Sequence, residues 1–302
     1  MKNKIIWFSG NLVNSEDALI NVLSPTSQFG LNVFEGIRGY WSSRKGKMYI
    51  FRLHEHLNRL LESCKIIGIK CPYQVNELVE IVKKVVDSNK YKSDIAIRIT
   101  VFVDGEGSWN CSEPVNMFVS PVEKPRMNVA MMNAQKACIS SWQRINDNVM
   151  PPRIKLGANY LNGRYAHLQA KNSGFDLPIL LNEYGKVAEG AGSCIFLVKN
   201  GNLITPSVTS SILEGITRDS VIKLARERGI VTIEREVDRT ELYLADEVFF
   251  CGSAVELTTI GVIDQYTIGN GEAGELTKFL LKDYHLAVDG DLDKFKFWAH
   301  EL

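Results

Sequence analysis

Apolar residues recur along this chain with two periods, and each period predicts one kind of element. Short β-rich runs predict strands at Ile5–Phe8, Lys47–Phe51, Ile95–Val103 and Val115–Val119. Apolar residues three and four positions apart predict two helices between these runs, over His54–Ile67 and from Asn76 through Val86. We therefore expect the first part of the chain to be a mixed α/β domain.

The second part of the chain shows the same mixture. β-Rich runs predict strands at Asn128–Met132, at Ala137–Ser141, within Leu177–Thr205, at Ile230–Arg235 and at Glu247–Cys251. Helical spacing predicts helices over Asn159–Asn172, Thr217–Arg228 and Ala273–Leu286. The stretch Pro121–Met127 carries prolines and lysine and interrupts the pattern, so it is the expected linker.

The length of 302 residues favours more than one compact core. We expect an N-terminal α/β domain over residues 1–120, a linker region over 121–136 and a C-terminal α/β domain over 137–302. The chain has 45% hydrophobic and 23% charged residues, as ordinary soluble proteins do.

Charge and hydropathy exclude several kinds of partner. The 35 basic and 35 acidic residues balance, which argues against nucleic acid and against a membrane surface. No apolar run approaches the length that spans a bilayer, and the N-terminus lacks the pattern of a signal peptide. We therefore expect a cytoplasmic protein.

The cysteines and histidines do not predict a metal site. The six cysteines are scattered without a C-x-x-C pair, so we expect reduced, mostly buried thiols rather than disulfides or zinc ligands. His54 and His56 stand two residues apart in a helical segment and therefore point to different faces.

Lys155 stands in surroundings that suit covalent chemistry. It follows Pro151–Ile154 and precedes Leu156, Gly157 and a helix. A lysine in an apolar setting loses its charge more easily and becomes a nucleophilic amine, suited to a Schiff base. Small neighbours such as Gly157 would let a planar ring approach the backbone. Taken alone, the segment fits a solvated surface lysine better.

Three further segments set polar groups beside small residues. Glu189 precedes Gly190–Gly192 and could pair with the nitrogen of a pyridinium ring, although a hairpin explains the same residues. Gly215 precedes a helix that Thr217 could cap, whose first N–H groups suit a phosphate; a capped helix without a ligand is the alternative. Ser253 follows a strand and could complete an anion cradle or simply form a tight turn.

Together, these segments resemble the class IV aminotransferases, the fold type IV enzymes that depend on pyridoxal phosphate, and most closely the branched-chain amino-acid aminotransferases. The matching stretches come in family order and extend over nearly the whole chain. They are Phe34–Arg38, Phe51–Leu60, Lys155–Leu161, Glu189–Gly192, Gly215–Asp219 and Tyr243–Phe249. The resemblance implies a two-domain α/β fold with pyridoxal 5'-phosphate between the domains, and amino-group transfer between an amino acid and a 2-oxo acid.

The resemblance also implies roles for single residues. Lys155 would bind the cofactor covalently and move the proton, Glu189 would bind the pyridine nitrogen, and Tyr160 would bind the ring oxygen. The residues implied to hold the phosphate are Arg52, Ile216, Thr217 and Ser253. Those implied on the substrate side are Phe34, Arg98 and Ala254. A homodimer is implied as well, in which a loop within Asp104–Pro114 completes the neighbour's pocket.

The chain departs from the branched-chain pattern at several positions. Ala188 and Cys194 replace the usual serine and asparagine around Glu189. Bulky or polar pocket residues are replaced by Phe29, Ala96, Val122 and Pro125. We therefore expect substrates beyond leucine, isoleucine and valine, such as methionine or aromatic amino acids, with 2-oxoglutarate as the acceptor.

Two alternatives stay open. The first is a related class IV activity, either an aminodeoxychorismate lyase or a D-amino-acid transaminase, because pocket residues decide among these. The second is a protein that binds the cofactor without catalysis.

Overall fold

The computed structural model describes residues 4–302, which divide into two compact units. The first unit contains the chain up to Arg126, the segment Ile154–Ala158 and the C-terminal stretch Ala287–Leu302. The second unit contains Met127–Arg153 and Asn159–Leu286.

The division falls within the expected linker, 121–136, between Arg126 and Met127. The expected C-terminal domain over 137–302 is not continuous, however, because 154–158 and 287–302 belong to the first unit. No helix in the described part of the chain is long and apolar enough to cross a membrane.

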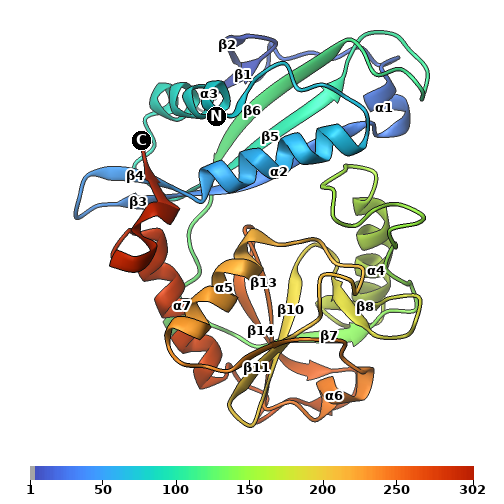
Figure 1. Cartoon of the computed structure of the whole chain (residues 1–302), viewed down its shortest axis with the longest axis vertical. Helices are drawn as coiled ribbons and strands as arrows, with labels where there is room; N and C mark the ends of the chain where they lie inside the picture. The colour runs from blue at the N-terminus through green and yellow to red at the C-terminus, as the bar shows by residue number, and fades with distance from the viewer. Residues whose placement is uncertain (1–3) are drawn as a thin grey trace. The chain divides into compact units, whose positions relative to one another are not determined.

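A seven-stranded antiparallel sheet forms the first unit (Figure 1). Its strand order is β16-β4-β3-β5-β6-β1-β2. The strands are β1 (Ile5–Phe8), β2 (Asn11–Asn14), β3 (Asn32–Ser42), β4 (Lys47–Phe51), β5 (Ile95–Val103), β6 (Val115–Glu123) and β16 (Ala299–Glu301). The sequence predicted β1, β4 and β5 with these bounds, but it did not predict β3.

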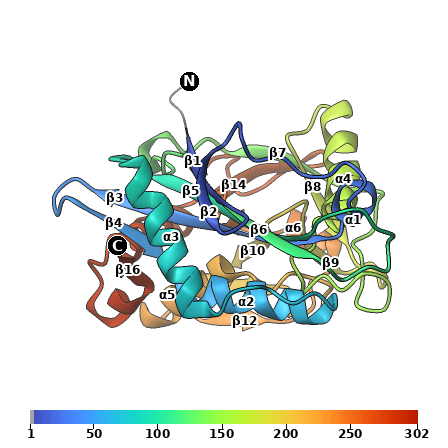
Figure 2. The same cartoon turned by 90° about the horizontal axis from the view of Figure 1, so that it is seen from above.

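Two long helices pack on this sheet, α2 (Leu53–Ile66) and α3 (Val75–Asn89). Figure 2 shows them meeting at an angle over the strands. Their apolar positions recur three and four residues apart, and they are buried against isoleucines and valines of β3, β5 and β6. A short helix, α1 (Pro25–Phe29), precedes β3, and a 3-10 turn, η2 (Asp293–Trp298), precedes β16.

A buried charged cluster ties β3 to α2. The Glu35 carboxylate is fully buried and accepts hydrogen bonds from Arg59 Nε at 2.7 Å and Nη2 at 2.9 Å. His56 Nδ1 lies 2.7 Å from the same carboxylate. Burial alone would raise the pKa of Glu35, but Arg59 and His56 hold that pKa well below its usual range. This stabilisation is therefore present at neutral pH and is lost only in strong acid, as the pH falls through the folded-state pKa.

The second unit is built on a nine-stranded mixed sheet with the order β12-β11-β10-β13-β14-β7-β8-β9, in which β15 also pairs with β14. The strands are β7 (Gln135–Ile139), β8 (Leu177–Leu181), β9 (Val187–Gly190), β10 (Cys194–Lys199), β11 (Asn202–Thr205), β12 (Thr232–Glu234), β13 (Glu247–Gly252), β14 (Glu256–Ile263) and β15 (Tyr266–Thr267). The helices are α4 (Tyr160–Asn172), α5 (Ile216–Glu227), α6 (Arg239–Tyr243) and α7 (Glu275–Val288).

The second unit corrects two expectations. The run Asn128–Met132 is not a strand: it contains a single 3-10 turn, η1 (Val129–Met131). Thr217 does not cap α5, because the helix begins at Ile216 with Gly215 at the N-cap position. Ala137, Ile179 and Ile195 of this sheet form an apolar core with neighbouring residues, and this core fixes the strands that carry the polar groups described below.

We predict that Glu35→Gln destabilises the first unit by about 3–5 kcal/mol, because it leaves the buried charge of Arg59 without its carboxylate. Urea unfolding followed by circular dichroism measures this loss. The matched control is Glu301→Gln, which breaks the exposed ion pair with Lys47 in the same sheet and should leave the urea midpoint almost unchanged, because water screens that pair. Equal, small effects of both substitutions would contradict the role given to the buried cluster.

Candidate active site

Lys155 lies on the sheet of the first unit, beside an isolated β-bridge between Leu156 and Val33 of β3. The N-terminal half of β3 pairs with β5 on one side, whereas β4 reaches only its C-terminal half. The vacant side is taken by 155–157: Phe34 N donates to Lys155 O at 3.0 Å. Gly157 N donates to Asn32 O at 2.9 Å. A Cβ on Gly157 would lie 2.5 Å from Asn32 Oδ1, so this close pairing, rather than the approach of a ring, requires glycine here.

The Lys155 side chain lies beside two residues that the sequence assigned to the substrate side. Its Nζ is 5.0 Å from the centroid of the Phe34 ring, and the Arg98 guanidinium is 3.8 Å from the same ring. Ser63 Oγ accepts a hydrogen bond from Lys155 N at 3.2 Å. The first unit therefore brings Lys155, Phe34 and Arg98 together, with Lys155 half-buried.

One face of α2 points toward Lys155 and Glu35. His56, Arg59 and Ser63 are spaced three and four residues apart, so they share a helical face. Burial lowers the pKa of His56, and the charges of Arg59 and Lys155 lower it further, against the opposing effect of Glu35. His56 is therefore neutral at pH 7 and donates its Nδ1 hydrogen to Glu35.

Arg52 stands at the start of α2, where its backbone is left-handed rather than helical. It is the N-cap residue of α2, its Nε donates to Glu55 Oε1 at 2.8 Å, and its guanidinium lies 4.9 Å from the Trp298 ring. Eleven residues separate it from Ser63, which is about 16 Å along a helix. Ser63, the α2 residue that bonds to Lys155 N, is therefore closer along the helix to Arg59 than to Arg52.

Glu189 ends a buried strand of the second unit, and its carboxylate is held by several donors. Only 3% of Glu189 is exposed. Its Oε1 accepts from Arg144 Nε at 2.9 Å, from Arg144 Nη2 at 2.8 Å and from Leu213 N at 3.2 Å. Cys194 Sγ lies 3.8 Å from Oε2. Guanidinium and peptide donors of this kind fix the orientation of a buried carboxylate.

Sequence reasoning missed Arg144. It follows β7 in an irregular segment that carries no motif, and the only signal was an arginine shortly after a predicted strand. The replacement at Cys194 has a visible consequence, because its thiol occupies a place next to Glu189. Cys194 stands opposite Cys251 in the β10–β13 pairing, and burial raises the pKa of Cys251, which is therefore a neutral thiol. Ala188 is fully buried.

Other predicted residues gather around the glycine loop that follows Glu189. Tyr160, the first residue of α4, lies with its Cε1 3.5 Å from the point where Gly192 would carry a Cβ. A Cβ on Gly252 would lie 3.7 Å from Gly192 O. Gly252 directly precedes Ser253 and the exposed Ala254, so this turn lies beside the glycine loop.

The start of α5 lies next to the same group. A Cβ on Gly215 would meet Cys194 Sγ at 2.8 Å, so glycine lets the helix start approach the thiol beside Glu189. Ile216 and Thr217 form the first turn and are buried. The first N–H groups of a helix cannot bond to carbonyls of that helix, and the macrodipole favours an anion there.

The predicted residues therefore form one group in each unit, and their chemistry fits pyridoxal phosphate. The second unit offers a buried carboxylate for a ring nitrogen, a phenol, a helix start and a hydroxyl. The first unit offers an amine on a fixed backbone and the arginine Arg59. An acid for the ring nitrogen, anion donors for a phosphate and a lysine are the groups that this cofactor requires.

Comparisons with known proteins identify the family of the chain. The family model "Amino-transferase class IV" matches residues 32–263. A probable branched-chain-amino-acid aminotransferase of Aquifex aeolicus is 38% identical over 97% of this chain and 94% of its own length.

Two solved structures are similar over almost the whole chain. The branched-chain amino acid aminotransferase of Thermobaculum terrenum in its PLP-form is 40% identical, covers 99% of this chain and 98% of its own, and has a TM-score of 0.93. The branched-chain amino acid aminotransferase of T.th., complexed with N-(5'-phosphopyridoxyl)-L-glutamate, is 36% identical, covers 99% and 98%, and has a TM-score of 0.92. With its family model, its relatives and its donor set in agreement, the chain belongs to the class IV aminotransferases.

Proposed function

We propose that this protein is a pyridoxal-phosphate-dependent transaminase that exchanges the amino group between branched-chain L-amino acids and 2-oxoglutarate. The observation that carries the proposal is the placement of Lys155, on a paired backbone beside Phe34, in a chain of this family. The substrates follow from the relatives, which are named branched-chain aminotransferases, one of them complexed with a phosphopyridoxyl-glutamate.

When bound, pyridoxal phosphate supplies an electron sink for the electrons of the substrate's Cα–H bond. With that sink in place, the Lys155 amine would take the proton from the substrate's Cα and hold it for return. Glu189 keeps the ring nitrogen protonated, and Arg144 holds the Glu189 carboxylate in place. The start of α5 and Ser253 bind the phosphate, while Arg98 and Ala254 lie on the substrate side.

We propose Arg59 as the phosphate-binding arginine of the first unit. Its support is the face that Arg59 shares with Ser63, whose hydroxyl bonds to Lys155 N. Arg52 remains an expectation from the family resemblance; it pairs with Glu55, as Arg59 pairs with Glu35.

We predict that Arg59→Ala weakens cofactor affinity about tenfold or more, because a charge-assisted phosphate contact contributes about 1.5–3 kcal/mol. Arg52→Ala, the matched control, should change affinity less than threefold. Titration of the apoprotein with pyridoxal phosphate, followed by absorbance, measures both. Because Arg59→Ala also disturbs Glu35, Arg59→Lys serves as a second variant that keeps the charge. A larger loss with Arg52→Ala would instead make Arg52 the phosphate-binding residue.

The substrate pocket should be wider than in the relatives. Ala96 and Val122 are directly opposed across β5 and β6, and both side chains share a sheet face with Arg98. Small residues at two opposed positions leave space beside Arg98, which is expected on the substrate side. Phe29 and Pro125 are exposed within the first unit and fit the same expectation less directly.

We predict measurable transamination of leucine, isoleucine and valine with 2-oxoglutarate, and activity on methionine or phenylalanine within about tenfold of leucine. An apolar pocket separates such side chains by only about 1–3 kcal/mol per methylene. A table of kcat/KM values across L-amino acids tests this. Strict preference for the three branched-chain substrates would refute the wider pocket. Activity only on D-alanine or aminodeoxychorismate would favour the alternative class IV enzymes.

The matched controls for this table are two lysine variants. Lys155→Ala should abolish turnover, whereas Lys136→Ala, at an exposed position of β7, should leave it unchanged. A protein that binds the cofactor but turns over no substrate would match the non-catalytic alternative.

We further propose a homodimer that forms through the first unit. Leu19, Val22 and Trp109 are 78%, 74% and 71% exposed. Gly107 N donates a hydrogen bond to Leu23 O. The loop within Asp104–Pro114, which carries Trp109, therefore lies beside the segment that carries Leu19 and Val22. Clustered exposed apolar side chains of this size are typical of interaction surfaces.

We predict that sedimentation equilibrium gives twice the mass of 33.9 kDa for the wild type. Val22→Asp should yield monomers, because it places a charge in the proposed interface. Val231→Asp, at a position that is 58% exposed in the second unit, is the matched control and should remain dimeric. A monomeric wild type would contradict the proposal.

A further inference from the structure

The turn between β13 and β14 ends at a residue with unusual backbone geometry. Gly252 and Glu256 are opposed in this hairpin, so Ser253, Ala254 and Val255 form its three-residue connection. Glu256 has a φ of +50°, which places it in the left-handed region. Glycine adopts a positive φ readily, whereas a glutamate persists there only when its surroundings hold it.

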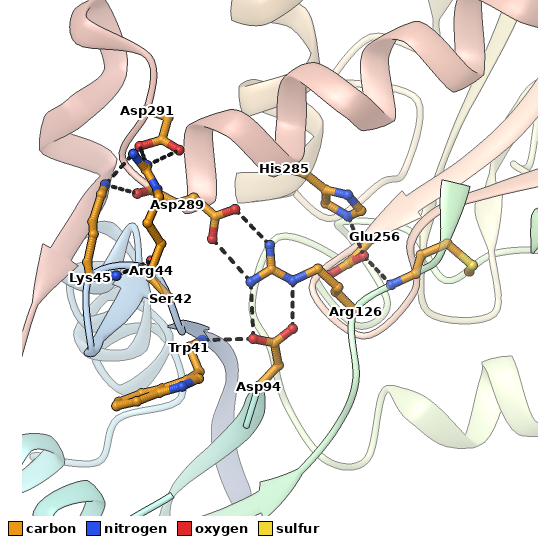
Figure 3. Close-up of polar contacts among 11 residues, drawn as sticks. Trp41, Ser42, Arg44, Lys45, Asp94, Arg126, Glu256, His285, Asp289 and Asp291 are labelled. Carbon is orange, nitrogen blue, oxygen red and sulfur yellow. Dashed lines mark hydrogen bonds and ion pairs between the residues drawn. The ribbon is translucent and has the colours of Figure 1, made fainter. Parts of the chain in front are cut away.

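The carboxylate of Glu256 provides that hold. Only 1% of Glu256 is exposed. Its Oε2 accepts a hydrogen bond from Met127 N at 2.8 Å and lies 3.1 Å from His285 Nε2, which comes from α7 (Figure 3). A carboxylate can only accept, so His285 donates through Nε2. The buried Glu256 side chain thus connects the hairpin to α7 and to Met127, the first residue of the segment 127–132.

The two ends of this connection line the same cavity. A cavity of about 320 Å³ in the second unit is lined by Met127, Met131 and Met132 together with residues of β13 and β14. Val255 and Leu257, the chain neighbours of Glu256, are among those lining residues. Glu256 is therefore bonded covalently to one part of the lining and by a hydrogen bond to another.

Methionine side chains adapt readily to the shape of what they contact, so packing alone defines the methionine side of this cavity poorly. The hydrogen bond from Met127 to a buried carboxylate is directional and fixes the backbone there. On the other side of the Arg126–Met127 peptide, Arg126 is held within the first unit by Asp94 and Asp289 (Figure 3). Loss of the Glu256 bond would therefore release only the residues from Met127 onward.

We propose that Glu256 is a positioning residue for substrate selection: its carboxylate holds the methionine-lined segment 127–132 at a fixed distance from the Ser253–Val255 turn. This inference rests on the proposed transaminase function, in which Ser253 of that turn binds the cofactor phosphate and Ala254 lies on the substrate side. With the distance fixed, side chains longer than those of the preferred substrates are disfavoured. Without the hydrogen bond from Met127 to Glu256, the segment moves and the enzyme discriminates less between short and long substrate side chains.

The test compares three variants of the holoenzyme. Glu256→Gly removes the tether but suits the left-handed backbone, so it should fold. Glu256→Gln keeps an oxygen that can accept from Met127 N and should retain most of the wild-type behaviour. Asn200→Gly is the matched control, because Asn200 has the same φ of +50° in an exposed turn and is not part of the cavity lining.

The first readout is hydrogen–deuterium exchange over residues 127–135. We expect about tenfold faster exchange in Glu256→Gly, the effect of one lost hydrogen bond to a charged group, and no change in Asn200→Gly. The second readout is the ratio of kcat/KM for leucine to that for methionine. We expect this ratio to fall about fivefold or more in Glu256→Gly, chiefly through KM, with unchanged cofactor affinity.

Each outcome bears on a separate claim. Unchanged exchange in Glu256→Gly would refute the tether. Faster exchange with an unchanged substrate ratio would refute substrate selection and leave Glu256 a merely structural residue. If the wild type transaminates no amino acid, the proposed function fails, while the exchange measurement still decides whether Glu256 holds the segment.

Discussion

The backbone pairing of Lys155–Gly157 with β3 is the interaction on which the rest of the site depends. It brings five residues from the middle of the chain into the first unit, where Ser63 and Phe34 surround the lysine. Two peptide hydrogen bonds, Phe34 N to Lys155 O and Gly157 N to Asn32 O, fix the backbone at the lysine. A reactive amine on a fixed base loses little further freedom when it reacts.

The second unit solves a different problem, the burial of a negative charge. The Glu189 carboxylate is withdrawn from water, which is costly unless donors compensate for the lost hydration. Arg144 and the Leu213 amide supply them. A charge held in this way is already oriented before any ligand arrives, which is how a carboxylate stabilises a protonated ring nitrogen without reorganising. Glu35 and Arg59 apply the same principle to structure in the first unit.

The regular parts of the fold could be predicted from local pattern, because β5 is a simple apolar run and α2 has clear helical spacing. β3 could not, since Glu35 and Arg38 interrupt its apolar pattern. Their charges are satisfied by distant partners, Arg59 and the Lys124 carbonyl, which no local window reveals. The division into two discontinuous units also depends on contacts between distant segments, such as the pairing of 155–157 with β3, which local pattern does not reveal. In the site, motifs identified Lys155 and Glu189, whereas Arg144 and Arg59 depend on spatial proximity alone.

The central claim is that Lys155 and Glu189 together support transamination of branched-chain amino acids. A half-reaction tests it most directly: L-leucine is added to the purified, cofactor-loaded protein without an acceptor, and the absorbance spectrum is recorded. We expect the yellow absorbance of the pyridoxal form to be lost and 2-oxoglutarate to restore it. A spectrum that stays unchanged with leucine, isoleucine and valine would contradict these roles of Lys155 and Glu189.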